Sequence, residues 1–101
     1  MNGVALTKPA QSLASAIIDF GLINLATTSV SCQAMTLNNI KDGGTYSLII
    51  KGATAATCSF TASGFTVKLP TGHGATTVSK WTVYTFIAAG TDLLVSWVPG
   101  F

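Results

Sequence analysis

The alternation of apolar and polar positions predicts short β-strands along most of the chain. In TYSLIIK (residues 45–51), Tyr46, Leu48 and Ile50 fall on one side of an extended segment and polar residues fall mainly on the other. Turn-forming stretches such as NNIKDGG (residues 38–44) separate these segments at intervals of about eight to twelve residues. The pattern predicts an all-β fold, an antiparallel β-sandwich of jelly-roll type.

The C-terminal stretch TVYTFIAAGTDLLVSWVPGF (residues 82–101) predicts a hairpin that is apolar on both faces. A hairpin in a small domain normally exposes one of its faces to water. We therefore expect Tyr84, Phe86 and Leu94 to line an interface with other copies of the chain. The alternative is that the domain's own N-terminal segment covers the second face.

The composition supports an interface and argues against two classes of partner. Of the 101 residues, 49% are hydrophobic and 8% are charged, and interface cores are typically depleted in charge. The formal net charge of +2 is spread thinly, so no basic stripe is present that could bind nucleic acid. No apolar run approaches the roughly 20 residues that a membrane-spanning helix needs.

Two cysteines, Cys32 and Cys58, allow a single disulfide. Spacing alone leaves two alternatives open, because buried, reduced cysteines are also common in protein cores. Neither cysteine lies in a CxxC motif or near a histidine at ligand spacing, so the sequence predicts no metal site.

Candidate catalytic residues are few, and we expect no enzymatic activity and no cofactor. The only histidine, His73, lies between glycines in a turn-rich loop, where an imidazole would be poorly held as a general base. The only carboxylates are Asp19, Asp42 and Asp92, each at or near a turn or strand edge.

The loop PTGHGATTVSK (residues 70–80) is the best candidate for a binding site. His73, Lys80 and Trp81 bring an imidazole, an ammonium group and a flat aromatic face close together in the sequence. Such groups suit the recognition of sugar rings. The alternative is that His73 is a solvated loop residue and Trp81 a core anchor.

Several motifs resemble a known group of proteins. DGGTYSLIIKG (residues 42–52) and TVYTFIAAGTDLLVSW (residues 82–97) resemble segments of the C-terminal domains of phage tail fibres. Residues 17–101, including the terminal SWVPGF, are more closely similar to the tip domains of the mosaic adhesive trimers of predatory bacteria. The resemblance implies a homotrimeric β-sandwich at the end of a fibre whose stalk precedes Met1. It also implies that Cys32 and Cys58 are a recurring pair.

These observations together give an expected organisation and function. Residues 1–15 are expected to be a lead-in segment from the stalk, and residues 16–101 the tip domain; a short helix over Ala10–Ile17 is an alternative. The expected function is that of a non-enzymatic adhesin on a cell surface or a virion tail, which recognises a surface ligand, a glycan in particular, through apical loops. The alternative is a structural trimerisation cap that binds no ligand.

Overall fold

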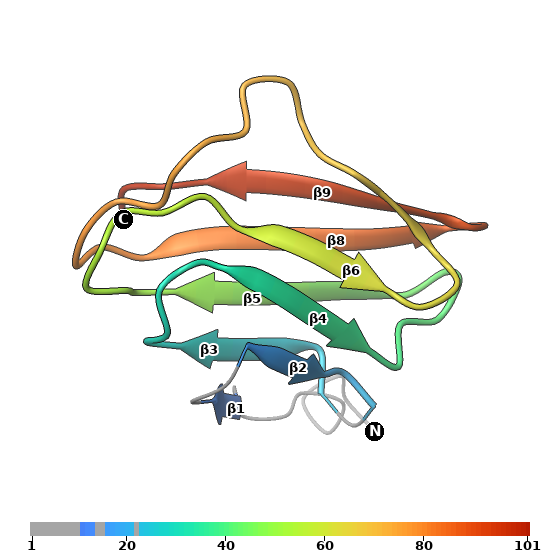
Figure 1. Ribbon diagram of the computed structural model, residues 1–101. Coiled ribbons are helices and arrows are strands. Elements are labelled where there is room, and N and C mark those ends of the chain that lie inside the picture. Colours follow the sequence, from blue (N-terminus) through green and yellow to red (C-terminus); the bar gives the residue numbers. More distant parts are fainter. Residues whose placement is uncertain (1–10, 14–15, 22) are drawn as a thin grey trace, which may run out of the picture.

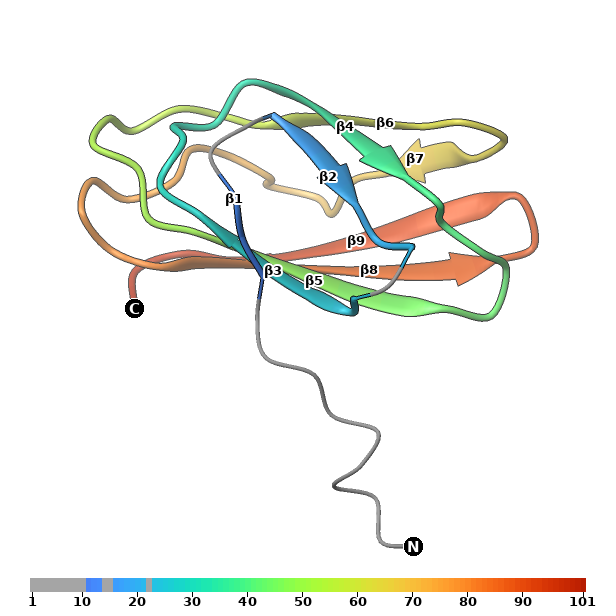
Figure 2. The ribbon, with the colours of Figure 1, turned by 90° about the horizontal axis from the view of Figure 1, so that it is seen from below.

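The computed structural model describes residues 11–13, 16–21 and 23–101, and it is all-β (Figure 1). Two sheets face each other in two layers (Figure 2). The larger sheet has the strand order β1-β3-β5-β8-β9-β7, and the smaller has the order β2-β4-β6. The strands are β1 (Gln11–Leu13), β2 (Ile17–Asp19), β3 (Leu25–Thr28), β4 (Ala34–Asn38), β5 (Thr45–Ile50), β6 (Ser59–Ala62), β7 (Thr66–Lys68), β8 (Thr82–Ala89) and β9 (Asp92–Val98).

Strands β1 to β6 alternate between the two sheets as the chain advances. Each strand therefore pairs in parallel with the strand two places earlier, as when Leu25 of β3 lies opposite Ser47 of β5. Parallel neighbours need a long crossover connection, and here the crossover itself contains a strand of the opposite sheet. We call this first part, the strands β1 to β6 and the described residues between them (within residues 11–62), the coil.

The prediction of antiparallel, jelly-roll-like pairing is wrong for most of the described strands. Five of the seven strand pairs are parallel, and only β5 with β8 and β8 with β9 are antiparallel. The alternation of apolar residues identifies which face of a strand is buried, but it is the same for parallel and antiparallel neighbours. The all-β class is confirmed.

The C-terminal hairpin, β8 with β9, forms as the sequence predicts. Its register places Phe86 opposite Val95 and Ala89 opposite Asp92. Gly90 occupies the turn with φ of 65°, a left-handed conformation that glycine adopts without steric cost. The hairpin joins the coil because β8 also pairs with β5.

The core lies between the two sheets and contains Tyr84 and Phe86. Both side chains are fully buried within the single chain. The ring of Phe60, from the smaller sheet, packs edge-on against both, with centroid distances of 4.9 Å to Tyr84 and 5.0 Å to Phe86. The prediction that these two aromatics line a subunit interface is therefore wrong, because the smaller sheet covers them. Leu94 points the other way and is 44% exposed.

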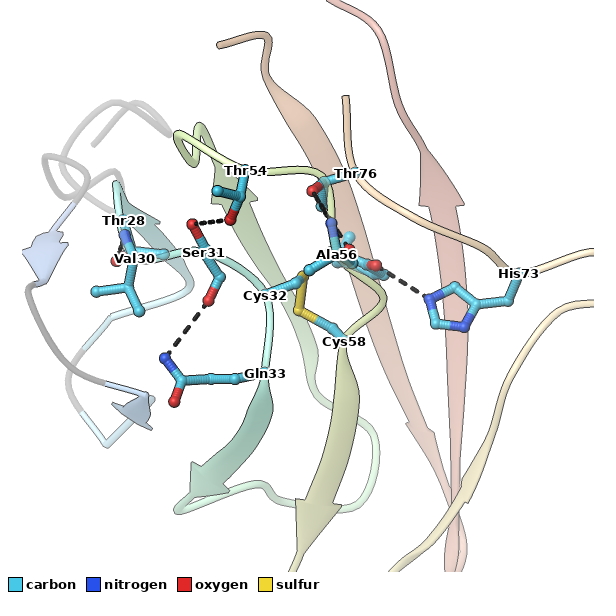
Figure 3. The surroundings of a disulfide bond; sticks show 11 residues. Thr28, Val30, Ser31, Cys32, Gln33, Thr54, Ala56, Cys58, His73 and Thr76 are labelled. Carbon is cyan, nitrogen blue, oxygen red and sulfur yellow. Dashed lines mark hydrogen bonds between the residues drawn. A yellow bond between two sulfur atoms is a disulfide. The ribbon is translucent and has the colours of Figure 1, made fainter. Parts of the chain in front are cut away.

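Cys32 and Cys58 form a disulfide at one end of the coil (Figure 3). Their Cα atoms are 4.6 Å apart, and both residues are buried. The bond joins the segment just before β4 to the segment just before β6, so it ties together two neighbouring parallel strands. Nearby, the Thr54 hydroxyl donates to the Ser31 hydroxyl at 2.9 Å.

The N-terminal lead-in lies mostly outside the described residues. Within it, Gln11–Leu13 forms β1, an edge strand beside β3, and just after it Ile17–Asp19 forms β2. Those residues of the alternative helix over Ala10–Ile17 that the structure describes are thus not helical. The alternative that the N-terminal segment covers an apolar face concerns residues 1–15, most of which lie outside the described part. In the described segments, no helix is long and apolar enough to cross a membrane.

Candidate functional site

The loops gather at the two ends of the strands (Figure 1). One end, the disulfide end, carries the loop at residues 29–33, the loop at residues 51–58 and the long connection at residues 69–81. The other end carries the β2–β3 loop and the β4–β5 and β8–β9 turns, and we call it the turn end. At the turn end Asp42 Oδ1 accepts a hydrogen bond of 2.7 Å from Gly90 N.

His73 is half-buried and packs against rings of the inner face instead of projecting freely from its loop. Its Nε2 lies 3.0 Å from the Tyr84 hydroxyl, and its ring meets those of Tyr84 and Trp97 edge to face at 5.7 and 5.6 Å between centroids. Burial lowers the pKa of His73, and burial raises the pKa of Tyr84 to about 12. Both rings are therefore held neutral near pH 7 and help to fix the long connection against the inner face of β8 and β9.

Trp81 lies on the opposite face of the same sheet. Its backbone N–H donates to Phe101 O at 2.9 Å, and Phe101 N–H donates back to Trp81 O at 3.0 Å. The Lys51 ammonium group lies 5.4 Å from the centre of the Trp81 ring, a cation–π contact. A shallow apolar groove of about 290 Å³ runs beside the indole; it is lined by Thr27, Ile49, Trp81, Val83 and Phe101.

The predicted binding set of His73, Lys80 and Trp81 is not brought together. His73 faces the core side of β8, whereas Trp81 faces outward, so the sheet separates the two rings. Lys80 is exposed, and its backbone N–H donates to Thr77 O at 3.2 Å. The two alternatives for these residues are also wrong. His73 is held against the rings of the inner face and is not simply solvated, and Trp81 is 38% exposed and is therefore not a core anchor.

The side chains of the larger sheet that point away from the smaller sheet form three cross-strand rows. We call these three rows together the outer face. One row is mainly apolar, the middle row carries hydroxyl groups and Leu25, and the third row combines Ile87 and Leu94 with Thr45 and Lys68. Ile87, Leu94 and Val98 are 44%, 44% and 48% exposed. The rows are Thr27–Ile49–Val83–Val98, Leu25–Ser47–Thr85–Ser96 and Thr45–Ile87–Leu94–Lys68.

A second, larger groove opens at the turn end, and we call it the polar groove. Its volume is about 650 Å³, and its walls come from the β2–β3 loop and the β4–β5 turn. Asp19 is the only residue of this groove that the sequence singled out, and then only as a weak catalytic candidate. The lining residues are Asp19, Phe20, Gly21, Ile23, Asn24, Asn39, Lys41 and Tyr46.

Comparison with protein-family models, curated proteins and solved structures found no match to this chain. The function must therefore be inferred from the geometry of the molecule itself. Among the residues that the structure describes, no three His, Cys, Asp or Glu side chains are grouped so that they could hold a metal ion.

The sequence missed the polar groove because its members come from distant segments. Asn24 belongs to the β2–β3 loop, whereas Asn39 and Lys41 belong to the β4–β5 turn. The sequence predicts NNIKDGG to be a turn, and a turn explains its composition without any ligand. The left-handed backbone of Asn39, with φ of 62°, is seen only in the structure.

Proposed function

We propose that this chain is the non-enzymatic tip of a homotrimeric fibre that recognises a surface glycan. The proposal is carried by the outer face, a surface of apolar and hydroxyl side chains with charges only at its ends, which the described chain leaves open on one side of its larger sheet. The smaller sheet already covers the inner side of the larger sheet, so a different partner is needed to cover the outer face.

The distribution of charge favours a second copy of the chain as this occupant. The charged side chains near the outer face are Lys51, Lys68 and Asp92, all at the ends of its strands. The centre has only apolar and hydroxyl side chains, and interface cores are depleted in charge in the same way. Four strands about 4.8 Å apart, with rows that reach over about five residues at 3.3 Å, span roughly 300 Å². Exposed patches of a few hundred Å² are often functional.

A homotrimer would also suit weak ligand sites. Three copies on one fibre raise the effective concentration of each site once the first is engaged. The fibre location, the extracellular setting and the trimeric state are parts of this proposal. They rest on the outer face together with the similarity of the motifs in residues 17–101 to adhesive fibre tips.

Light scattering during size-exclusion chromatography tests the proposed assembly. The wild-type chain should elute as a trimer of 10.3 kDa subunits at micromolar concentration. Leu94→Lys, which replaces one of the exposed apolar side chains of the outer face by a charge, should give a folded monomer. Val78→Lys is the matched control, because Val78 is 48% exposed but lies in the connection before β8. A wild-type monomer would remove the support for the proposal.

Glycan binding separates the adhesin from the trimerisation cap. The trimer would be applied to an array of cell-wall and cell-surface glycans. Binding by the trimer supports the adhesin. A trimer that binds no glycan on the array would instead support the purely structural cap.

A further inference from the structure

The polar groove has the size of a small-molecule site and an apolar floor. Its volume of about 650 Å³ lies within the usual range for ligand pockets, about 300–1,000 Å³. Phe20 and Tyr46 are almost completely buried, with ring centroids 5.0 Å apart, and Ile23 packs partly buried against the same core. The groove is thus backed by the rigid core, although its rim consists of loops.

Asp19 supplies a fixed acceptor at the rim. Its Oδ1 accepts hydrogen bonds from Gly21 N at 2.8 Å and from Asn39 Nδ2 at 2.6 Å. Both bonds go to one oxygen, and Oδ2 has no hydrogen-bond partner among the described residues. The two bonds lower the pKa of Asp19, so the carboxylate stays ionised near neutral pH. The side chain is therefore oriented in advance with one oxygen uncommitted.

Donors and further acceptors line the same groove. The Tyr46 hydroxyl accepts a bond of 3.0 Å from Lys41 N, which leaves its own proton to be donated. The Asn24 amide donates to Thr45 O at 3.1 Å, which leaves its carbonyl oxygen as an acceptor. The Lys41 ammonium group makes no ion pair with any described residue. The groove therefore presents both kinds of hydrogen-bonding group around an apolar floor.

We propose that the polar groove binds a neutral sugar ring. A sugar hydroxyl both donates and accepts, so it can donate to Asp19 Oδ2 and accept from Lys41 or Tyr46. The less polar C–H face of the ring can lie on the floor formed by Phe20 and Ile23. One carboxylate and one ammonium group nearly cancel in charge, which favours a neutral ligand over an anion or a cation. This inference rests on the proposed adhesin function and names the site and ligand class.

The groove beside Trp81 is a poorer sugar site despite its exposed indole. Thr27 is the only polar side chain in its lining, so little there can orient hydroxyl groups. It also lies on the outer face, which the proposed assembly would cover. The exposed indole is better explained as part of the contact between copies.

Amide NMR titration tests the inference on the intact chain. The probes are methyl α-mannopyranoside, methyl β-galactopyranoside and N-acetylglucosamine at millimolar concentration. At least one should shift the Gly21 amide and the side-chain amides of Asn24 and Asn39 in a saturable way. Asp19→Asn should weaken that binding by about tenfold or more, since a hydrogen bond to a charged group is lost. Asp92→Asn, the same change in the β8–β9 hairpin, should leave it unchanged.

A second variant keeps the test valid if Asp19→Asn disturbs the loop. Lys41→Ala removes only an exposed side chain, because the bond to Tyr46 uses the backbone, and it should weaken sugar binding severalfold. Shifts confined to Trp81 or His73 would overturn this site but leave the proposed function standing. No shift with any probe, or equal binding in all three variants, would also overturn it. The proposed site would also be overturned if calcium chloride alone reproduced the amide shifts.

Discussion

The coil and the C-terminal hairpin are built from similar strands but are held together differently. In the coil, neighbours such as β4 and β6 are parallel and reached only after the chain has crossed to the other sheet and back. In the hairpin, β8 and β9 are joined by a tight turn and pair over seven positions. The disulfide lies in the coil, whereas the aromatic rings buried between the sheets come from both regions: Tyr84 and Phe86 from β8, and Phe20, Tyr46 and Phe60 from the coil. Packing thus holds both regions together, and the distant pairing of the coil has a covalent bond in addition.

The difference matters for folding as well as for stability. Parallel pairs between distant residues require loops to be closed before any contact is formed, which slows folding. A hairpin with a favourable turn pays a much smaller entropy cost. We therefore expect the hairpin and β5 to order before the coil closes, and the coil to be the less protected region once the disulfide is removed.

Phe86→Ala should have the largest effect on stability. The side chain is fully buried and touches Phe60 across the two sheets, so its removal should lower the free energy of unfolding by about 3–5 kcal/mol. Ile87→Ala, one residue along on the outer face, should cost about 1 kcal/mol or less in the monomer. Urea denaturation measures both. Equal costs at the two positions would mean that the hairpin does not separate a core face from an open face.

Replacing both Cys32 and Cys58 by serine should have the next largest effect. The bond closes a loop with a sequence separation of 26, so the chain-entropy model gives a loss of about 3–4 kcal/mol. Amide hydrogen exchange should accelerate in β4 and β6 much more than in β8 and β9. Thr54→Ala, which removes only the nearby hydroxyl contact, serves as the control and should cost less than about 1 kcal/mol. Uniform acceleration across both regions would contradict the division between coil and hairpin.

Asp42→Ala, which removes a contact between the turns of the two regions, should have a smaller effect on stability. The residue belongs to the β4–β5 turn, and its carboxylate accepts from Gly90 N in the hairpin turn. Its loss should lower the free energy of unfolding by about 1 kcal/mol. Asp42→Asn keeps an acceptor oxygen and should recover most of that loss. If both variants behave like wild type in thermal unfolding, the contact between the turns does not contribute to stability.

The smallest expected effect is a pH dependence that arises from His73. Because burial lowers its pKa below the ordinary value of 6.5, the unfolded chain takes up this proton at higher pH than the folded chain. The contribution to stability is thus complete above the unfolded pKa and declines as the pH falls through 6.5 towards the folded pKa. Urea midpoints at about pH 7.5 and about pH 5 should differ in the wild type. In His73→Gln this difference should shrink; an unchanged pH dependence would assign it to other groups.

Much of the secondary structure could be predicted from the alternation of side chains. The inward positions of Tyr46, Leu48 and Ile50 are buried as expected, and so are Tyr84 and Phe86, which were assigned to the wrong partner. The error has a physical reason. Alternation shows that Tyr84 and Phe86 share a face, but not whether Phe60 of the same chain or another copy covers it.

The candidate sites were harder to predict than the strands. His73 and Trp81 are close in sequence but lie on different sides of the sheet. Trp81 and Tyr84 have opposite parity along the strand and so point to opposite faces, and His73 packs from its loop against Tyr84 on the inner face. The polar groove unites Asp19 and Asn24 with Asn39 and Lys41, and no local pattern links these two segments. Only the parallel pairing of β2 with β4 brings them to one end of the molecule.

Residue types and a period of two were sufficient to predict the all-β class and the hairpin at Thr82–Val98, and the shortage of charge is a matter of composition. Folding of the whole chain was needed to fix the parallel coil, the side of the sheet on which each aromatic ring lies, and the meeting of the two polar loops. Those features depend on which distant strands pair, and strand pairing is chosen by the packing of the whole core rather than by any single segment.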